Sequence, residues 1–205
     1  MNKRLFLPVA LCLLFSGCDD STAPLSDVKT AKIDEHLVGD WKQVMEKGEA
    51  IYHVEKAGKS LPDGVVHVRV TGKEENGAAK TPSDYLAFTM TIDGTTYLNV
   101  VINNDQVAKL TEEGWKAGLV TNYCLYRYKI VGDKASLWVL DEDAKKQAIR
   151  DGKIQGKLPD NGNTRPTTFT DTSPNLASFV AKSGDAIWNT KDVVHFARVK
   201  SEATK

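Results

Sequence analysis

The sequence has few cysteines and no excess of charge of either sign. Only 3 of its 205 residues are cysteine, and 27 lysines and arginines balance 27 acidic residues. A disulfide-rich scaffold is therefore excluded, and the lack of a basic excess argues against nucleic acid as a partner. Long apolar runs are absent as well, since none approaches the ~20 residues that a helix needs to span a bilayer.

The chain also lacks the short motifs that mark common active sites. It contains no G-x-S-x-G, no phosphate-binding P-loop and no glycine-rich dinucleotide-binding turn. Without a catalytic constellation we expect a protein that is not an enzyme and uses no cofactor. The alternative is that the protein is an enzyme, namely a periplasmic hydrolase.

The histidines form no H-x-x-x-H pair and no cluster with cysteine, so we expect no metal site. Two of them leave one question open. If residues 51–56 and 65–70 form a hairpin, His53 and His67 would lie nearly opposite each other, with Glu55 close by. The alternative is that both histidines face solvent on a polar side of the sheet.

What the sequence does contain is a secretory signal at its N-terminus. Lys3 and Arg4 give a positive start, an apolar stretch runs from Leu5 to Phe15, and small residues follow it. The apolar stretch is too short to cross a bilayer as a helix. These features predict that residues 1–17 are a signal peptide that is removed.

Residues Phe15-Ser16-Gly17-Cys18 resemble a bacterial lipobox. In proteins with this motif, diacylglycerol is attached to the cysteine thiol and the chain is cut just before that cysteine. The resemblance implies that Cys18 is lipidated and that the protein faces the periplasm from a membrane. Because each buried methylene contributes ~0.8 kcal/mol, two or more acyl chains anchor a protein stably. The pair Asp19-Asp20 resembles the signal that keeps enterobacterial lipoproteins in the inner membrane, with the outer membrane as the alternative.

Processing at this site changes the cysteine count. Cys12 leaves with the signal peptide and Cys18 carries lipid, so only Cys124 remains as a thiol. No intramolecular disulfide is then possible. Cys124 lies in an apolar and aromatic strand pattern, which predicts a buried, unreactive thiol.

From residue 38 onward the chain has the pattern of antiparallel strands. Apolar and polar residues alternate in 65–70, 85–92 and 95–102, and Asp93-Gly94 is a strong hairpin signal. The whole pattern predicts about eight strands. A sheet of this size avoids exposed edges by closing into a barrel. We therefore expect a mainly β protein built on an antiparallel barrel.

Two short helices are predicted between the later strands. Asp141 has the properties of an N-cap, acidic residues follow it, and Gly152 ends the helix. Ser173 is expected to cap the second helix, with Pro174 in its first turn. Helix capping explains the acidic residues 141–143, so we assign them no catalytic role.

Gly39-Asp40-Trp41 matches the G-x-W that opens the first strand of lipocalins, and Thr121-Asn122-Tyr123 resembles the T-D-Y before a later lipocalin strand. The resemblance implies a lipocalin-like barrel. It also implies that Trp41 plugs the closed end and that Arg198, in the last strand, covers Trp41.

A second resemblance lies near the predicted helices. Residues 137–141 and 148–156 are similar to a run that recurs in bacterial secreted proteins of unassigned function. The similarity extends over roughly residues 37–200 and implies a lipocalin-like fold without implying an activity.

Aromatic side chains are candidates for lining the barrel interior. A barrel of about eight strands is either filled by side chains or holds one small ligand, and the sequence leaves both alternatives open. The candidate lining residues are Phe88, Tyr97, Tyr126, Tyr128 and Trp138.

The predicted organisation has four parts. Residues 1–17 are the signal peptide, 18–36 the lipidated N-terminus and tether, 37–200 the lipocalin-like barrel domain, and 201–205 a disordered tail. We expect a membrane-anchored binding or interaction module that takes a small apolar ligand or an envelope or toxin protein. A structural subunit of an envelope complex and a periplasmic hydrolase are the alternatives.

Overall fold

The computed structural model describes residues 20–46, 48–101, 107, 110–116, 119–159 and 166–200. The predicted signal peptide, the predicted lipidation site Cys18 and the predicted tail 201–205 lie outside these ranges.

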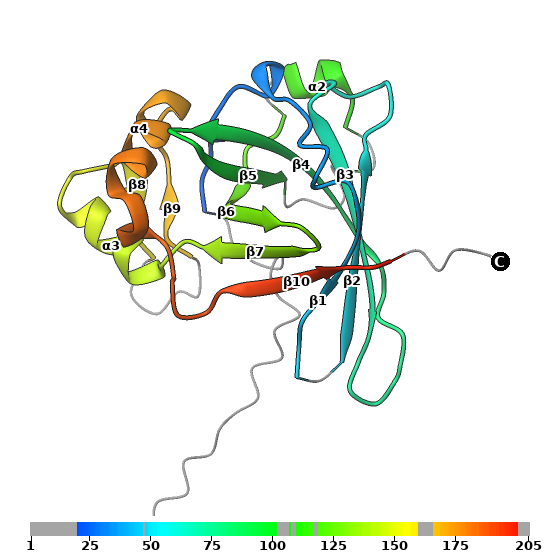
Figure 1. The fold of residues 1–205 in the computed structure, drawn as a ribbon. Helices are drawn as coiled ribbons and strands as arrows, with labels where there is room; N and C mark the ends of the chain where they lie inside the picture. Colours follow the sequence, from blue (N-terminus) through cyan, green and yellow to red (C-terminus); the bar gives the residue numbers. More distant parts are fainter. Residues whose placement is uncertain are drawn as a thin grey trace, which may run out of the picture.

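Eight antiparallel strands form a closed barrel (Figure 1). Each strand pairs with the next along the chain, and the last strand, β10, pairs with both β7 and β1. This confirms the expected mainly β fold with an antiparallel barrel of about eight strands. The strands are β1 (Gly39–Gln43), β2 (Glu49–Lys56), β3 (Val65–Lys73), β4 (Ser83–Ile92), β5 (Thr95–Val101), β6 (Tyr123–Val131), β7 (Lys134–Val139) and β10 (Val194–Arg198).

The hairpin between β4 and β5 forms where the sequence predicts it. Asp93 and Gly94 occupy its two loop positions with φ angles of 49° and 78°, and Ile92 pairs with Thr95. Two positive φ values are what a tight primed turn requires, because its twist matches that of the strands. The dipeptide therefore sets the register of both strands.

The long connection between β7 and β10 folds into a separate layer at one side of the barrel (Figure 1). It contains α3 (Glu142–Arg150), the two-stranded sheet of β8 (Gly156–Lys157) and β9 (Thr168–Phe169), α4 (Ser173–Ser183) and the 3-10 helix η2 (Gly184–Ile187). Shorter helical turns elsewhere are η1 (Val28–Thr30) and α2 (Glu112–Lys116).

The caps of α3 and α4 follow the sequence closely. The Asp141 side chain accepts a hydrogen bond of 2.9 Å from the Ala144 amide, as expected of an N-cap. The second helix begins at Ser173, so its N-cap is Thr172, one residue before the predicted position. β8 and β9 are not predicted, because two-residue strands are too short to show any periodicity.

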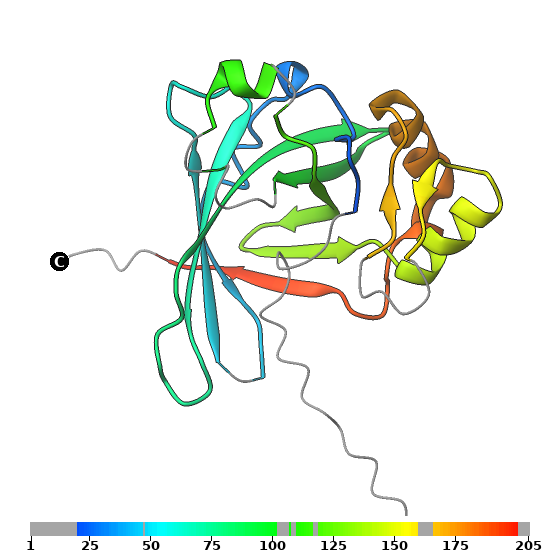
Figure 2. The ribbon, with the colours of Figure 1, turned by 180° about the vertical axis from the view of Figure 1, so that it is seen from behind.

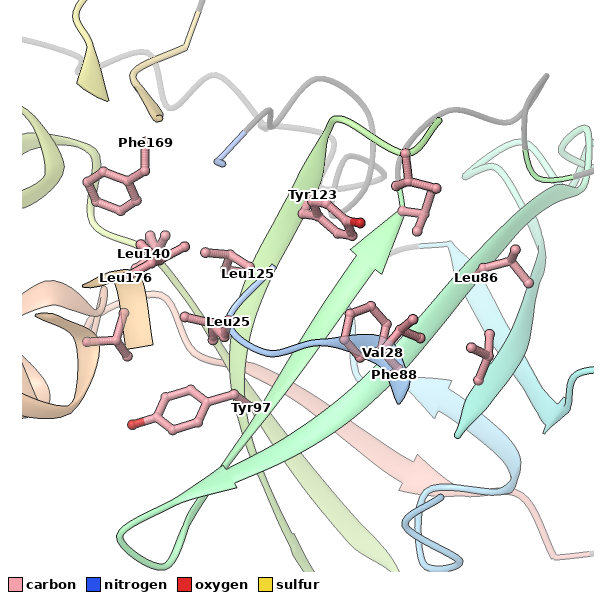
Figure 3. Packing of buried hydrophobic residues seen from close by; sticks show 14 of the residues in the cluster. Leu25, Val28, Leu86, Phe88, Tyr97, Tyr123, Leu125, Leu140, Phe169 and Leu176 are labelled. Atoms are coloured by element: carbon pink, nitrogen blue, oxygen red, sulfur yellow. The ribbon is translucent and has the colours of Figure 1, made fainter. Parts of the chain in front are cut away.

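Strands β4, β5 and β6 are buried on both faces, which divides the core into two clusters. An interior cluster fills the barrel and includes Trp41, Tyr52 and Tyr126. An outer cluster lies between these strands and the segments that cover them, and includes Phe88 and Phe169. Figure 3 shows part of the outer cluster.

The segment between residues 20 and 37 is not the tether that the sequence predicts. Leu25 is 1% exposed, and together with Val28 it packs in the outer cluster beside Phe88 and Leu125 (Figure 3). The Leu25 amide also donates a hydrogen bond of 2.7 Å to the buried Asn99 side chain. Full burial of a leucine contributes about 1.5–3 kcal/mol, so this N-terminal segment is an integral part of the domain.

Candidate functional site

The barrel interior is filled by side chains. A cavity of about 60 Å³ remains, and its exposed lining is wholly apolar. The polar atoms of the interior have partners: the Tyr52 hydroxyl donates to Gln43 at 3.1 Å, and the Tyr128 hydroxyl donates to Asp34 at 2.8 Å. Burial raises the pKa of both phenols above the ordinary value. The interior is therefore a packed core, with space for little more than a water-sized molecule.

The five aromatic residues proposed to line the interior do not lie together. Tyr126 and Tyr128 belong to the interior cluster, and Tyr128 lines the small cavity. Phe88 and Tyr97 belong to the outer cluster instead, where Figure 3 shows them beside the N-terminal segment. Trp138 lies 4.6 Å from the Arg127 guanidinium carbon, measured from the ring centroid, and also packs against the outer cluster. The strand alternation separates these residues into two sets without indicating which set faces inward.

Trp41 and Arg198 meet at one end of the barrel. The two residues are paired across β1 and β10, and the Arg198 guanidinium carbon lies 4.2 Å from the Trp41 ring centroid. Arg198 also donates hydrogen bonds to the carbonyls of His36 and Val38, and the Trp41 indole donates to the Leu37 carbonyl at 2.8 Å. A cation over the face of a tryptophan and two carbonyl bonds fix the segment that precedes β1.

The largest groove described lies outside the barrel, between α3 and the pair α4–η2. Its volume is about 780 Å³. Apolar side chains from α3 and from α4 and η2 line the groove, and its charged lining residues are Lys153, Lys182 and Asp171. The apolar lining residues are Ala144, Ala148, Ile154, Phe179, Ala186 and Ile187.

Asp171 links two of the segments that line this groove. One of its oxygens accepts from the Asn175 side chain and the Thr172 amide, each at 2.8 Å, and the other accepts from the Gln155 amide at 3.1 Å. The Asn175 hydrogen bond and the amides lower the pKa of Asp171, which keeps it charged. Asp171 thus joins the start of α4 to the segment that follows α3.

Sequence reasoning located both helices but missed the groove between them. Ala144 on α3 and Ser178 on α4 are small, and both line the groove. The small residues were the available signal, but the sequence does not show that α3 and α4 lie side by side, so the groove could not be predicted.

A buried charged network fixes the start of the described chain. Lys145, on α3, contacts Asp20 at 2.8 Å and Glu142 at 3.0 Å, and its ammonium donates to the Thr167 carbonyl at 2.9 Å. Asp20 also accepts from the Leu125 amide at 3.1 Å. The side chains of Lys145 and Asp20 are 3% and 9% exposed. Charges buried this deeply are tolerated because each is paired and hydrogen-bonded.

The pKa values of the network reflect competition between burial and pairing. Burial raises the pKa of Asp20, while the Lys145 ammonium acts to lower it. Burial alone would lower the pKa of Lys145, but the two carboxylates raise it above its usual value. The pKa of Glu142 is lowered despite its partial burial, because Thr167 and Lys145 favour its charged form. Lys145 is therefore held in its charged form.

His53 and His67 do not lie opposite each other on β2 and β3, as a shared metal site would have required. His53 pairs across the strands with Arg69, and His67 pairs with Glu55. His53 instead lies 2.9 Å from Asp40 and 3.2 Å from the Thr71 hydroxyl. His67 lies between Glu55 and Asp84, at 3.3 Å and 3.1 Å.

The His53 imidazole thus lies between the Asp40 carboxylate and the Thr71 hydroxyl and contacts both. His53 lines neither the interior cavity nor the groove between α3 and α4, and its side chain is 43% exposed. Over the part of the chain that the structure describes, no three His, Cys, Asp or Glu side chains are arranged to hold a metal ion.

Two further expectations concern the burial of Cys124 and the presence of membrane-spanning helices. Cys124 is completely buried, as its strand pattern predicts. Among the described residues, no helix is both long and apolar enough to cross a bilayer.

The described residues thus define a closed eight-stranded antiparallel barrel with a filled interior and an outer helical layer, a fold that by itself indicates no function. Comparisons of the chain with models of known protein families, with curated proteins and with solved structures found no match.

Proposed function

We propose that the chain is a bacterial lipoprotein that binds a protein partner at the periplasmic side of a membrane. The N-terminal signal layout and the lipobox-like residues ending in Cys18 support lipid anchoring. Asp19-Asp20 favours the inner membrane over the outer membrane. The barrel then serves as a scaffold that carries a binding surface.

We favour a protein partner over a small apolar ligand because the barrel interior is filled. Ligand pockets usually have volumes of about 300–1,000 Å³, whereas the interior cavity has about 60 Å³. A small apolar ligand could enter only if packed side chains such as Tyr128 and Phe196 moved aside. Carriage of such a ligand inside the barrel is therefore the less favoured of the two expected functions.

The surface we assign to partner binding is the groove between α3 and α4. It combines apolar lining residues with the exposed lysines Lys153 and Lys182, and protein-binding surfaces likewise combine an apolar centre with a polar border. Lys153 is paired with Asp151 at 2.9 Å. A partner that presents an apolar side chain flanked by polar residues would complement this groove.

Lipid anchoring is tested by replacing cysteines in the full chain. Cys18→Ser should abolish labelling by radioactive palmitate and release the protein into the soluble fraction. Cys12→Ser is the matched control, since that residue leaves with the signal peptide, and it should be labelled like the wild type. A Cys18→Ser protein that stays labelled and membrane-bound would contradict the anchoring proposal.

Partner binding is tested by photo-crosslinking in living cells. A crosslinking amino acid in place of Ser178, in the groove, should give one defined protein adduct. The same amino acid in place of Glu74, in the β3–β4 hairpin, is the control and should not. Equal adducts at both positions would overturn the assignment, and so would native mass spectrometry that finds an apolar molecule bound in stoichiometric amount.

A further inference from the structure

The fold fixes the chain at residue 20 from several directions. The Asp20 carbonyl accepts from the Phe169 amide at 2.8 Å, and its carboxylate is held by Lys145 and Leu125. Ser21 and Tyr123 exchange two backbone hydrogen bonds, at 3.1 and 2.9 Å. The chain is thus attached to β6, β9 and α3 at once, and it cannot swing away at this point without breaking that network.

Asp20 is two positions after Cys18, with only Asp19 between them. An extended chain covers at most about 3.3–3.6 Å per residue, so the Cα atoms of the two residues are no more than about 7 Å apart. An acyl chain on Cys18 must enter the hydrocarbon layer. Lipid attachment would therefore bring Asp20, and the elements that hold it, to the level of the lipid headgroups.

We propose that the domain docks directly on a phospholipid bilayer, with the first turn of α3 at the lipid surface; this proposal rests on the lipid anchoring of Cys18 proposed above. Glu142 opens this turn and contacts the same lysine as Asp20. Asp143, next to it, has a side chain that is 96% exposed.

The orientation follows from the arrangement of the barrel. The β1–β2 and β3–β4 hairpins extend from the side of the molecule away from α3 and α4, as both views show (Figures 1 and 2). They would point away from the bilayer. The groove, which α3 lines with Ala144 and Gln147, would open beside it. A partner in the groove would then be held next to the membrane surface.

The contact does not depend on charge attraction to anionic lipid. The exposed groups at the first turn of α3 are acidic, and anionic headgroups repel carboxylates. Covalent acyl chains and the short connection supply the attachment. Docking should therefore be no stronger on vesicles that contain anionic lipid than on zwitterionic vesicles.

The experiment places one fluorophore at a time on the full lipidated chain in zwitterionic vesicles. Asp143→Cys and Glu74→Cys each replace an exposed acid, and Cys124 is completely buried and does not compete for the label. A short-range quencher on the lipid headgroups should remove most of the emission from position 143 and leave that from position 74 unchanged. An insertion of ten Gly and Ser residues between Asp19 and Asp20 should restore the emission at position 143.

The outcomes separate the two proposals. Protein that does not float with the vesicles would overturn lipid anchoring. Protein that floats but shows equal quenching at positions 143 and 74, or none at 143, would overturn direct docking and leave anchoring intact. Quenching at 143 that survives the insertion would also overturn it, because a flexible linker of ten residues spans about 16–19 Å.

Discussion

Asp20 and Lys145 are 125 positions apart in the chain and form an ion pair that is almost completely buried, with 2.8 Å between the Asp20 Oδ1 and Lys145 Nζ atoms. The pair joins the N-terminal segment to α3, so its removal should affect the whole domain.

Asp20→Asn should destabilise the domain by about 3 kcal/mol. The buried Lys145 ammonium would lose the negative charge of Asp20 and keep only that of Glu142. Lys145→Met in the same chain should recover part of that loss, since the buried charge is then gone. Urea unfolding of both single variants and the double variant gives the coupling energy directly. Strictly additive effects would show that the two side chains do not stabilise each other.

Gly39→Ala should destabilise the domain by about 1–3 kcal/mol. Gly39 has a φ angle of 125°, and a Cβ atom there would lie 2.7 Å from an Arg198 guanidinium nitrogen. Gly58→Ala is the control, because no atom lies within 4 Å of its Cβ position. Thermal unfolding should lower the midpoint for the first variant only; equal midpoints would refute the claim that Arg198 requires a glycine beside it.

Arg198→Lys keeps the charge over Trp41 but loses the planar fork that reaches the carbonyls of His36 and Val38. We expect a loss of about 1–3 kcal/mol in the free energy of unfolding. Arg69→Lys, on an exposed position of β3, is the matched control and should be close to neutral. A similar result for both variants would mean that charge alone explains the contact.

Alkaline solution should destabilise the domain. Burial raises the pKa of the Tyr123 phenol from 10.0 to about 12. Because the folded value is the higher one, the stabilisation is complete below pH 10 and is lost as the pH rises through the folded value. For Tyr123 the loss is roughly 3 kcal/mol. Burial raises the pKa of Tyr52, Tyr85 and Tyr128 too, so their contributions change in the same direction.

Urea unfolding between about pH 8 and pH 12, read beside the ultraviolet absorbance of tyrosinate, measures this loss. Tyr123→Phe removes one ionisable group and should weaken the decline. A stability that is flat over this range, with tyrosines that ionise near their ordinary pKa, would contradict the prediction.

Regular elements could be read from the sequence because their signals are local. Strand alternation and the Asp93-Gly94 turn identified the barrel strands, and capping chemistry placed the helix that begins at Glu142. Each of these patterns is formed by residues a few positions apart, so it can be recognised without knowledge of the tertiary structure.

Contacts between distant segments could not be read in the same way. Lys145 has the sequence context of an exposed basic residue in a helix, yet its side chain is 3% exposed, since its partner Asp20 comes from the other end of the chain. Residues 20–36 are polar enough to suggest a tether, and only the apolar outer face of β4–β6 explains why Leu25 and Val28 are buried.

The N-terminal segment also has a consequence for how the molecule folds. Its first described residue is held by α3, and the carbonyls of His36 and Val38, at its other end, are held by Arg198 of the last strand, 162 and 160 positions away. Contacts between such distant positions slow folding, because a long loop must close before they form. The segment is therefore expected to reach its final position late in folding.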